Sequence, residues 1–155
     1  MRKFVYIFVL CTLTVCTLVG CKKDSETEPD TLVGNVPEPA WTFPVEHDYT
    51  SSMTAIVKVN LTASYPELAK DFVLTDKDRL AAFSGSTCMG VASPKNGLFY
   101  LYVAPLSSFT GEVTLRYYSA HYKNLFESVN AFTFANDERL GTIAEPFTPQ
   151  WKVSR

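Results

Sequence analysis

Residues 94–103, Pro94-Lys95-Asn96-Gly97-Leu98-Phe99-Tyr100-Leu101-Tyr102-Val103, decide the fold. Asn96 and Gly97 form a pair that readily adopts the positive φ angles of a tight hairpin turn. Residues 98–103 are apolar or aromatic throughout, a composition typical of a β-strand. The stretch therefore predicts a hairpin in which residues 88–92 pair with residues 98–103, with the register set at Asn96-Gly97.

Further strand patterns lie on both sides of this hairpin. Apolar and mostly polar residues alternate at residues 53–61, which is the period of a half-buried strand. Other expected strands are residues 80–83, 113–118, 124–129, 132–134 and 151–153. One weak helical stretch is expected at residues 66–72. About seven strands separated by turn signals predict an all-β, antiparallel, immunoglobulin-like β-sandwich over residues 41–155.

Composition and charge exclude several classes of protein. The chain has 155 residues, a net charge of −2, 46% hydrophobic residues and 14% aromatic residues, which excludes a disordered polymer and a collagen-like fibre. From residue 21 onward, the 14 basic residues less Arg2 and Lys3 leave 12, against 16 acidic residues, so the charge is −4. A negative charge disfavours binding to phosphate backbones. No nucleic-acid partner is therefore expected.

The first twenty residues predict a signal peptide. Arg2 and Lys3 precede sixteen uncharged and mostly apolar residues, 4–19. This run is shorter than a membrane-spanning helix and ends at a small residue, Gly20.

Leu18-Val19-Gly20-Cys21 resembles the lipobox of bacterial lipoproteins. The resemblance implies cleavage before Cys21 and acylation of its thiol, including palmitate-type chains that anchor the protein in a membrane. Lys22 follows the cysteine, as in Gram-negative lipoproteins sorted to the outer membrane. Residues 22–28 also resemble the lysine-then-acid tract that marks lipoproteins for display on the cell surface, although a polar tether alone would have a similar composition.

Residues 21–40 are expected to form a flexible acidic linker, because they are rich in proline and contain no aromatic residue. Asp30-Thr31-Leu32 resembles an O-glycosylation site, which would place a glycan on Thr31. Cys88 is the one cysteine left after signal cleavage and acylation of Cys21, so no disulfide is expected within the mature monomer. Its apolar neighbours favour core packing over reactivity.

A second resemblance lies in the sandwich region. It is carried by Ser52-Met53-Thr54, by Asp78-Arg79-Leu80-Ala81-Ala82-Phe83-Ser84-Gly85 and by Cys88-Met89-Gly90-Val91-Ala92-Ser93. These residues resemble a β-sandwich module of surface and secreted proteins in bacteria that scavenge nutrients across an outer membrane. Met89 departs from the family pattern, which often has Arg at that position. The resemblance implies no catalytic activity, and it implies association with starch-utilisation-type (SusC/SusD-like) systems, each a TonB-dependent barrel with a lipoprotein lid.

Read from the residues alone, the same motif favours a structural role. Asp78 is placed to accept hydrogen bonds from turn amides, and Gly85 and Gly90 suit a bend and close packing. Asp76 and Asp78 supply too few ligands for a metal. No cofactor motif is present.

Few residues point to catalysis. The sequence contains two histidines, His47 and His121, and His47 lies within the polar cluster Glu46-His47-Asp48. The three residues of this cluster cannot all face one substrate, because neighbouring side chains of an extended chain point to opposite sides. A surface turn is therefore expected there. A hydrolase that uses His47 or a pair of carboxylates stays as a third hypothesis.

Binding is expected near residues 118–124. Tyr117 and Tyr118 are adjacent, so they cannot both face the core, and one of them together with Tyr122 is expected to be exposed. Tyr118, His121 and Tyr122 are the predicted contact residues for a glycan, a peptide or a protein. Trp41 and Trp151 are expected to be core or end-closing residues. The leading hypothesis is a non-enzymatic accessory subunit of the uptake complex, and the alternative is a free-standing glycan-binding module or adhesin.

Overall fold

The structure is a computed structural model that describes residues 32–44 and 47–154. The predicted signal peptide (1–20), the predicted lipidation site Cys21 and the predicted glycosylation site Thr31 lie outside these residues.

Apart from one short helix, all the regular secondary structure of the described residues is β-strand, and the expected all-β sandwich is confirmed. In chain order the elements are β1 (Met53–Val57), α1 (Leu61–Ser64), β2 (Arg79–Ser84), β3 (Thr87–Ala92), β4 (Pro94–Lys95), β5 (Leu98–Val103), β6 (Glu112–Ser119), β7 (Asn124–Ser128), β8 (Phe132–Thr133), β9 (Arg139–Leu140) and β10 (Trp151–Val153). β4 and β9 were not expected, because each is only two residues long and leaves little periodicity in the sequence.

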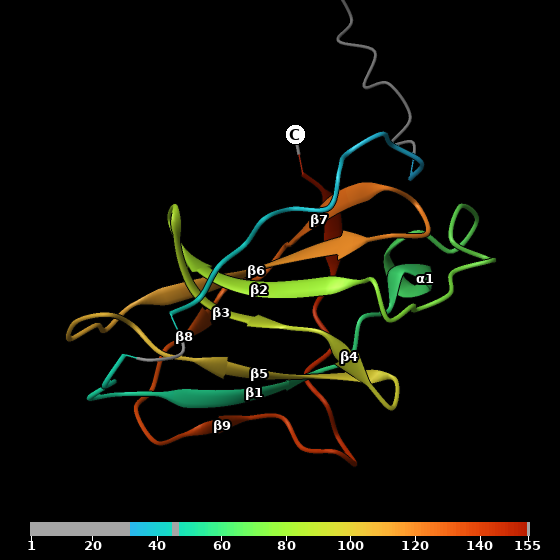
Figure 1. Cartoon of the computed structure of the whole chain (residues 1–155). Helices are drawn as coiled ribbons and strands as arrows, with labels where there is room; N and C mark the ends of the chain where they lie inside the picture. Colours follow the sequence, from blue (N-terminus) through green and yellow to red (C-terminus); the bar gives the residue numbers. More distant parts are fainter. Residues whose placement is uncertain (1–31, 45–46, 155) are drawn as a thin grey trace, which may run out of the picture.

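Two sheets enclose the core (Figure 1). The small sheet has the strand order β4-β5-β1-β9, and the large sheet has the order β10-β7-β6-β2-β3, with β8 paired to β6. Neighbouring strands are antiparallel except β1 and β9, which are parallel. Alternate residues of the central strands face inward, among them Phe99 and Leu101 of β5 and Leu115 and Tyr117 of β6.

The turn at residues 96–97 forms as predicted, but the pairing around it differs. Asn96 and Gly97 have φ angles of 52° and 78°, and the turn joins β4 to β5. The expected pairing of residues 88–92 with residues 98–103 is wrong, because the chain leaves the large sheet after β3 and enters the small sheet. β5 instead pairs along most of its length with β1, from Met53 opposite Val103 to Val57 opposite Phe99.

The two sheets lie very close to each other where β3 passes β5. A Cβ atom on Gly90 would lie 2.1 Å from the carbonyl oxygen of Tyr102. Next to it, the Ala104 N–H donates a 2.8 Å hydrogen bond to the Met89 carbonyl oxygen. Only glycine fits at this crossing, so the close-packing role expected for Gly90 is confirmed.

The expected strand 53–61 and helix 66–72 are both displaced. β1 ends at Val57, and the Asn60 side chain then accepts a hydrogen bond from the Ala63 N–H and so caps α1. Pro66 disfavours a helical conformation at the residue before it, and α1 ends at Ser64, so residues 66–72 form turns instead. No helix in the described ranges is long and apolar enough to cross a membrane.

The end of the predicted linker belongs to the folded domain. Leu32 is 4% exposed and joins the hydrophobic core, and its carbonyl oxygen accepts a 3.0 Å hydrogen bond from Asn124 Nδ2. The Gly34 N–H donates to the Tyr122 carbonyl oxygen at 2.9 Å. The prediction of a flexible linker that reaches residue 40 is therefore wrong from Leu32 onward.

Residues 32–43, which we call the strap, cross the outer face of the large sheet (Figure 1). Glu38 forms a 3.1 Å ion pair with Arg79 of β2. Further along, the Trp41 ring meets the Phe83 ring edge-on, with centroids 5.8 Å apart. Arg79 is the register partner of Tyr118 in β6, so the strap passes over the part of the sheet from which Tyr118 projects.

Candidate functional site

The tyrosines predicted to be exposed are buried. Tyr117 faces the core, Tyr118 is 6% exposed and Tyr122 is 5% exposed. The two adjacent tyrosines do face opposite sides of the sheet, but the strap crosses the outer face next to Tyr118, and the Tyr122 ring stacks on Phe72. The expectation of exposed tyrosines here is wrong. His121 is exposed, with its ring edge-on to that of Tyr122.

The histidines and the remaining cysteine lie apart from one another. His47 contacts Tyr49, whereas His121 contacts Tyr122. His47 and Asp48 are exposed, and Glu46 lies outside the described residues. Cys88 is half-buried rather than in the core, and burial raises the pKa of its thiol, an effect that a backbone hydrogen bond with Gly90 and the charge of Arg116 partly offset. Within the described ranges, no three His, Cys, Asp or Glu residues are grouped as a metal site.

Asp78 is a buried carboxylate with a structural function. It accepts hydrogen bonds from the Thr75 N–H and hydroxyl, from the Tyr117 hydroxyl and from the Ala120 N–H, at distances of 2.7 to 3.1 Å. These bonds join the turn before β2 to the end of β6. The predicted role of Asp78 as an acceptor for turn amides is confirmed.

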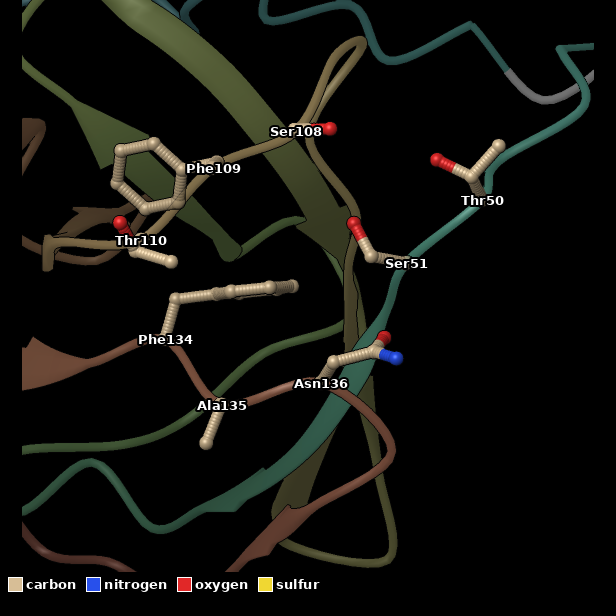
Figure 2. Close-up of a pocket in the computed structure, with 8 residues that line it drawn as sticks. All are labelled: Thr50, Ser51, Ser108, Phe109, Thr110, Phe134, Ala135 and Asn136. Atoms are coloured by element: carbon tan, nitrogen blue, oxygen red, sulfur yellow. The ribbon is translucent and has the colours of Figure 1, made fainter.

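A pocket of about 620 Å³ opens at one end of the sandwich (Figure 2). Three segments form its walls: the chain just before β1, the loop between β5 and β6, and the chain after β8. Its lining residues are Thr50, Ser51, Ser108, Phe109, Thr110, Phe134, Ala135 and Asn136. We call it the end pocket. Its volume falls within the range of roughly 300–1,000 Å³ that is typical of small-molecule sites.

The lining of the end pocket is uncharged. It consists of two phenyl rings, four hydroxyl groups, one amide and one methyl side chain. Figure 2 shows the rings of Phe109 and Phe134 on one side and the side chains of Ser51 and Asn136 across from them. The rings meet edge-on, with centroids 5.7 Å apart. The Oγ atom of Ser51 is buried, with no hydrogen-bond partner among the described residues.

Hydrogen bonds from backbone N–H groups hold the walls of the end pocket together. The Phe134 N–H donates to the Gly111 carbonyl oxygen at 2.8 Å. The Ser52 N–H donates to Asn136 Oδ1 at 2.8 Å, and the Asp137 N–H donates to the Ser52 carbonyl oxygen at 2.7 Å. All three segments are therefore fixed to a neighbour, and the end pocket is formed without a ligand.

Exposed aromatic side chains gather on the outer face of the small sheet. Phe99, Leu101 and Val103 of β5 point into the core, so Tyr100 and Tyr102 point outward, where they are 38% and 45% exposed. We call this surface the tyrosine face. A hollow of about 540 Å³, lined by Ser93, Lys95, Asn96 and Tyr100, adjoins it.

The far end of the tyrosine face is supported by segments before β1. The ring of Phe43 stacks on that of Tyr49, with centroids 5.1 Å apart. Both rings meet Tyr102 edge-on, each with its centroid 6.2 Å from that of Tyr102. These contacts fix the Tyr102 ring while leaving part of it open to solvent.

Sequence reasoning missed both surfaces, for different reasons. The alternation along residues 98–103 carries enough information to place Tyr100 and Tyr102 outward, because the side chains of a strand alternate between its faces. The end pocket has no comparable signal, since its residues come from three loops whose proximity depends on the whole fold.

Comparisons with models of protein families, with curated proteins and with solved structures find no match to this chain.

Proposed function

We propose that the protein is a non-enzymatic lipoprotein of the outer membrane, anchored through Cys21 and facing the cell exterior. It acts there as an accessory subunit of a TonB-dependent, SusC/SusD-like nutrient-uptake complex. The N-terminal sequence supports the anchor, since a run of sixteen uncharged and mostly apolar residues, 4–19, leads directly into Gly20-Cys21. The β-sandwich after the linker resembles a module of bacterial surface proteins, and this resemblance supports a role in binding.

The observation that supports this proposal best is the exposed tyrosine face. The strap crosses the outer face of the large sheet, whereas the small sheet leaves Tyr100 and Tyr102 exposed beside each other on one strand. Tyrosine is enriched at protein interfaces because its ring buries a large area while its hydroxyl keeps a polar partner. We assign the contact with the uptake complex to this face.

The length of the tether favours a partner in the same membrane. Ten residues, 22–31, lie between Cys21 and Leu32, where the folded domain already begins. A chain of that length spans at most about 40 Å. The domain therefore stays close to the lipid surface, where a membrane-embedded barrel and an anchored lid are present at high effective concentration.

The test is a mild-detergent pull-down of full-length, C-terminally tagged protein from native membranes, with mass spectrometry of the bound proteins. The wild type should recover a TonB-dependent barrel and its lid in near-equal amounts. The double substitution Tyr100→Ala and Tyr102→Ala should lose both. Val129→Ala, which truncates an exposed apolar side chain outside the tyrosine face, is the control and should retain them. Recovery of the wild type alone, with its lipid intact, would refute the proposal.

A free-standing glycan-binding module is the second candidate, and the uncharged end pocket is the observation that favours it. It predicts that the wild type is recovered without a barrel but still binds soluble polysaccharide.

A further inference from the structure

We propose that the end pocket is a binding site for a neutral oligosaccharide. The inference deepens the proposed function and rests on it for its biological meaning, because it names the class of nutrient that the accessory subunit would hold. The site differs from the tyrosine face and from the residues that the sequence pointed to.

The absence of charge in the lining selects the class of ligand. None of the eight lining residues is Lys, Arg, His, Asp or Glu. Phosphates, carboxylates and amines would lose hydration there without gaining a counter-charge, which costs free energy. Asp137, which follows Asn136 in the chain, is not among the lining residues, and its carboxylate accepts a 2.9 Å hydrogen bond from Asn136 Nδ2.

The mixture of rings and hydroxyl groups fits a sugar. Pyranose rings present apolar C–H faces edged by hydroxyl groups, so one face can pack on Phe109 while the edge bonds to polar side chains. Thr50, Ser108 and Thr110 are exposed and supply hydroxyl donors and acceptors.

Some hydrogen-bond donors and acceptors in the pocket wall are not used by the hydrogen bonds within the protein. The Asn136 amide uses one N–H and one lone pair in the bonds given above, and it keeps a second N–H and a second lone pair. Ser51 Oγ is a buried hydroxyl without a partner among the described residues. A ligand hydroxyl, or a water that it holds, would supply the missing bond.

The end pocket lies far from the point where the tether joins the domain. The strap begins beside Tyr122, just after the end of β6. The pocket wall at Gly111 lies just before the start of β6. The eight residues of β6 separate these points by about 25 Å. The pocket therefore lies at the other end of β6 from the point where the tether joins the domain, where polysaccharide outside the cell can reach it.

The test is isothermal titration calorimetry of purified full-length protein in detergent, with maltoheptaose, cellohexaose, xylohexaose and mannohexaose as neutral probes. Hexagalacturonate, which is charged, is the comparison probe. We expect saturable binding of at least one neutral probe and none of hexagalacturonate. Phe109→Leu keeps an apolar side chain but removes the ring face, and it should raise Kd by about tenfold, as expected for losing one ring contact. Phe109→Tyr keeps the ring and should retain binding.

Tyr100→Ala, which removes a ring of the tyrosine face that, among the described residues, does not contact the segment before β1, is the matched control, and it should leave Kd unchanged while weakening the pull-down described above. This separates failure of the sugar site from failure of the proposed function. No binding by any neutral probe would overturn the inference, as would binding of hexagalacturonate alone or equal affinity in wild type and Phe109→Leu. Circular dichroism of each variant identifies any loss of fold. If Phe109→Leu does not fold, the test rests on Phe109→Tyr, and loss of binding in a folded Phe109→Tyr would overturn the inference.

Discussion

The hydroxyl of Tyr117 donates a 2.7 Å hydrogen bond to Oδ2 of Asp78, a residue 39 positions earlier in the chain. Both side chains are fully buried. The bond joins the turn before β2 to the centre of β6, and two further donors at Thr75 and one at Ala120 complete the shell of Asp78. Asp78 is therefore a fixed part of the protein interior, although its side chain is charged.

Asp78→Ala should lower the free energy of unfolding by about 3 kcal/mol or more, because it leaves several buried donors without an acceptor. Tyr117→Phe removes one of these bonds and should cost about 1–2 kcal/mol. Urea denaturation followed by fluorescence measures both changes. Asp76→Ala, at an exposed neighbouring position, should stay within about 0.5 kcal/mol of wild type. Equal losses for Asp76→Ala and Asp78→Ala would contradict the structural role.

Tyr117 should also make the fold sensitive to alkali. Burial, with the charge of Asp78 as a second cause, raises the pKa of the Tyr117 hydroxyl. Below pH 10 the hydroxyl is neutral in both states, so stability does not depend on it. Above about pH 10 the unfolded chain loses this proton while the folded chain keeps it, so the free energy of unfolding should fall by about 1.4 kcal/mol per pH unit for this group.

Denaturation of wild type and Tyr117→Phe at pH 9 to 11 measures that dependence. The variant should show a slope shallower by close to one proton at the upper end of this pH range. Identical slopes in wild type and Tyr117→Phe would exclude Tyr117 as the group responsible.

The strap gives a prediction with an adjacent control. Leu32 is 4% exposed and Val33 is 70% exposed. Leu32→Ala should destabilise the protein by about 2–3 kcal/mol, since it removes methyl groups from the core, whereas Val33→Ala should change stability by less than about 0.5 kcal/mol. Chemical denaturation of the two variants decides whether the domain begins at Leu32. If Leu32→Ala lowers the free energy of unfolding no more than Val33→Ala does, the segment belongs to the linker and not to the folded domain.

Gly90 should tolerate no larger side chain. Gly90→Ala places a methyl group 2.1 Å from the Tyr102 carbonyl oxygen, so the two sheets must separate, at a cost of about 3 kcal/mol. Gly85→Ala meets no atom within 4 Å and carries only the strain of a φ of +58°, which costs about 1 kcal/mol. Thermal melts should rank Gly90→Ala well below Gly85→Ala. The reverse order would mean that the sheets are not this close in solution.

Local patterns in the sequence predict most strands, because the apolar and aromatic run of residues 98–103 and the turn at Asn96-Gly97 depend only on near neighbours. They do not predict which strands pair. Residues 88–92 and 98–103 are separated by a good turn, yet they lie in different sheets, because the chain passes from the large sheet to the small sheet between β3 and β4, and β5 pairs with β1.

Segments that are held by tertiary contacts are the ones that local reasoning misjudges. Residues 32–40 have the composition of a linker, but Leu32 finds a place in the core and Glu38 pairs with Arg79. The same strap explains why Tyr118, correctly expected to face away from the core, is not exposed. The end pocket could not be predicted because Ser51, Phe109 and Asn136 come together only once both sheets have formed.

The central claim is that the tyrosine face contacts an uptake complex in the membrane, and photo-cross-linking in living cells tests it most directly. p-Benzoylphenylalanine replaces Tyr100 or Tyr102 in the full-length lipoprotein, with replacement of Val129 as the control. After irradiation, positions 100 and 102 should yield covalent adducts with a TonB-dependent barrel or its lid, identified by mass spectrometry, and position 129 should not. Absence of adducts at positions 100 and 102, or equal adducts at position 129, would contradict the claim.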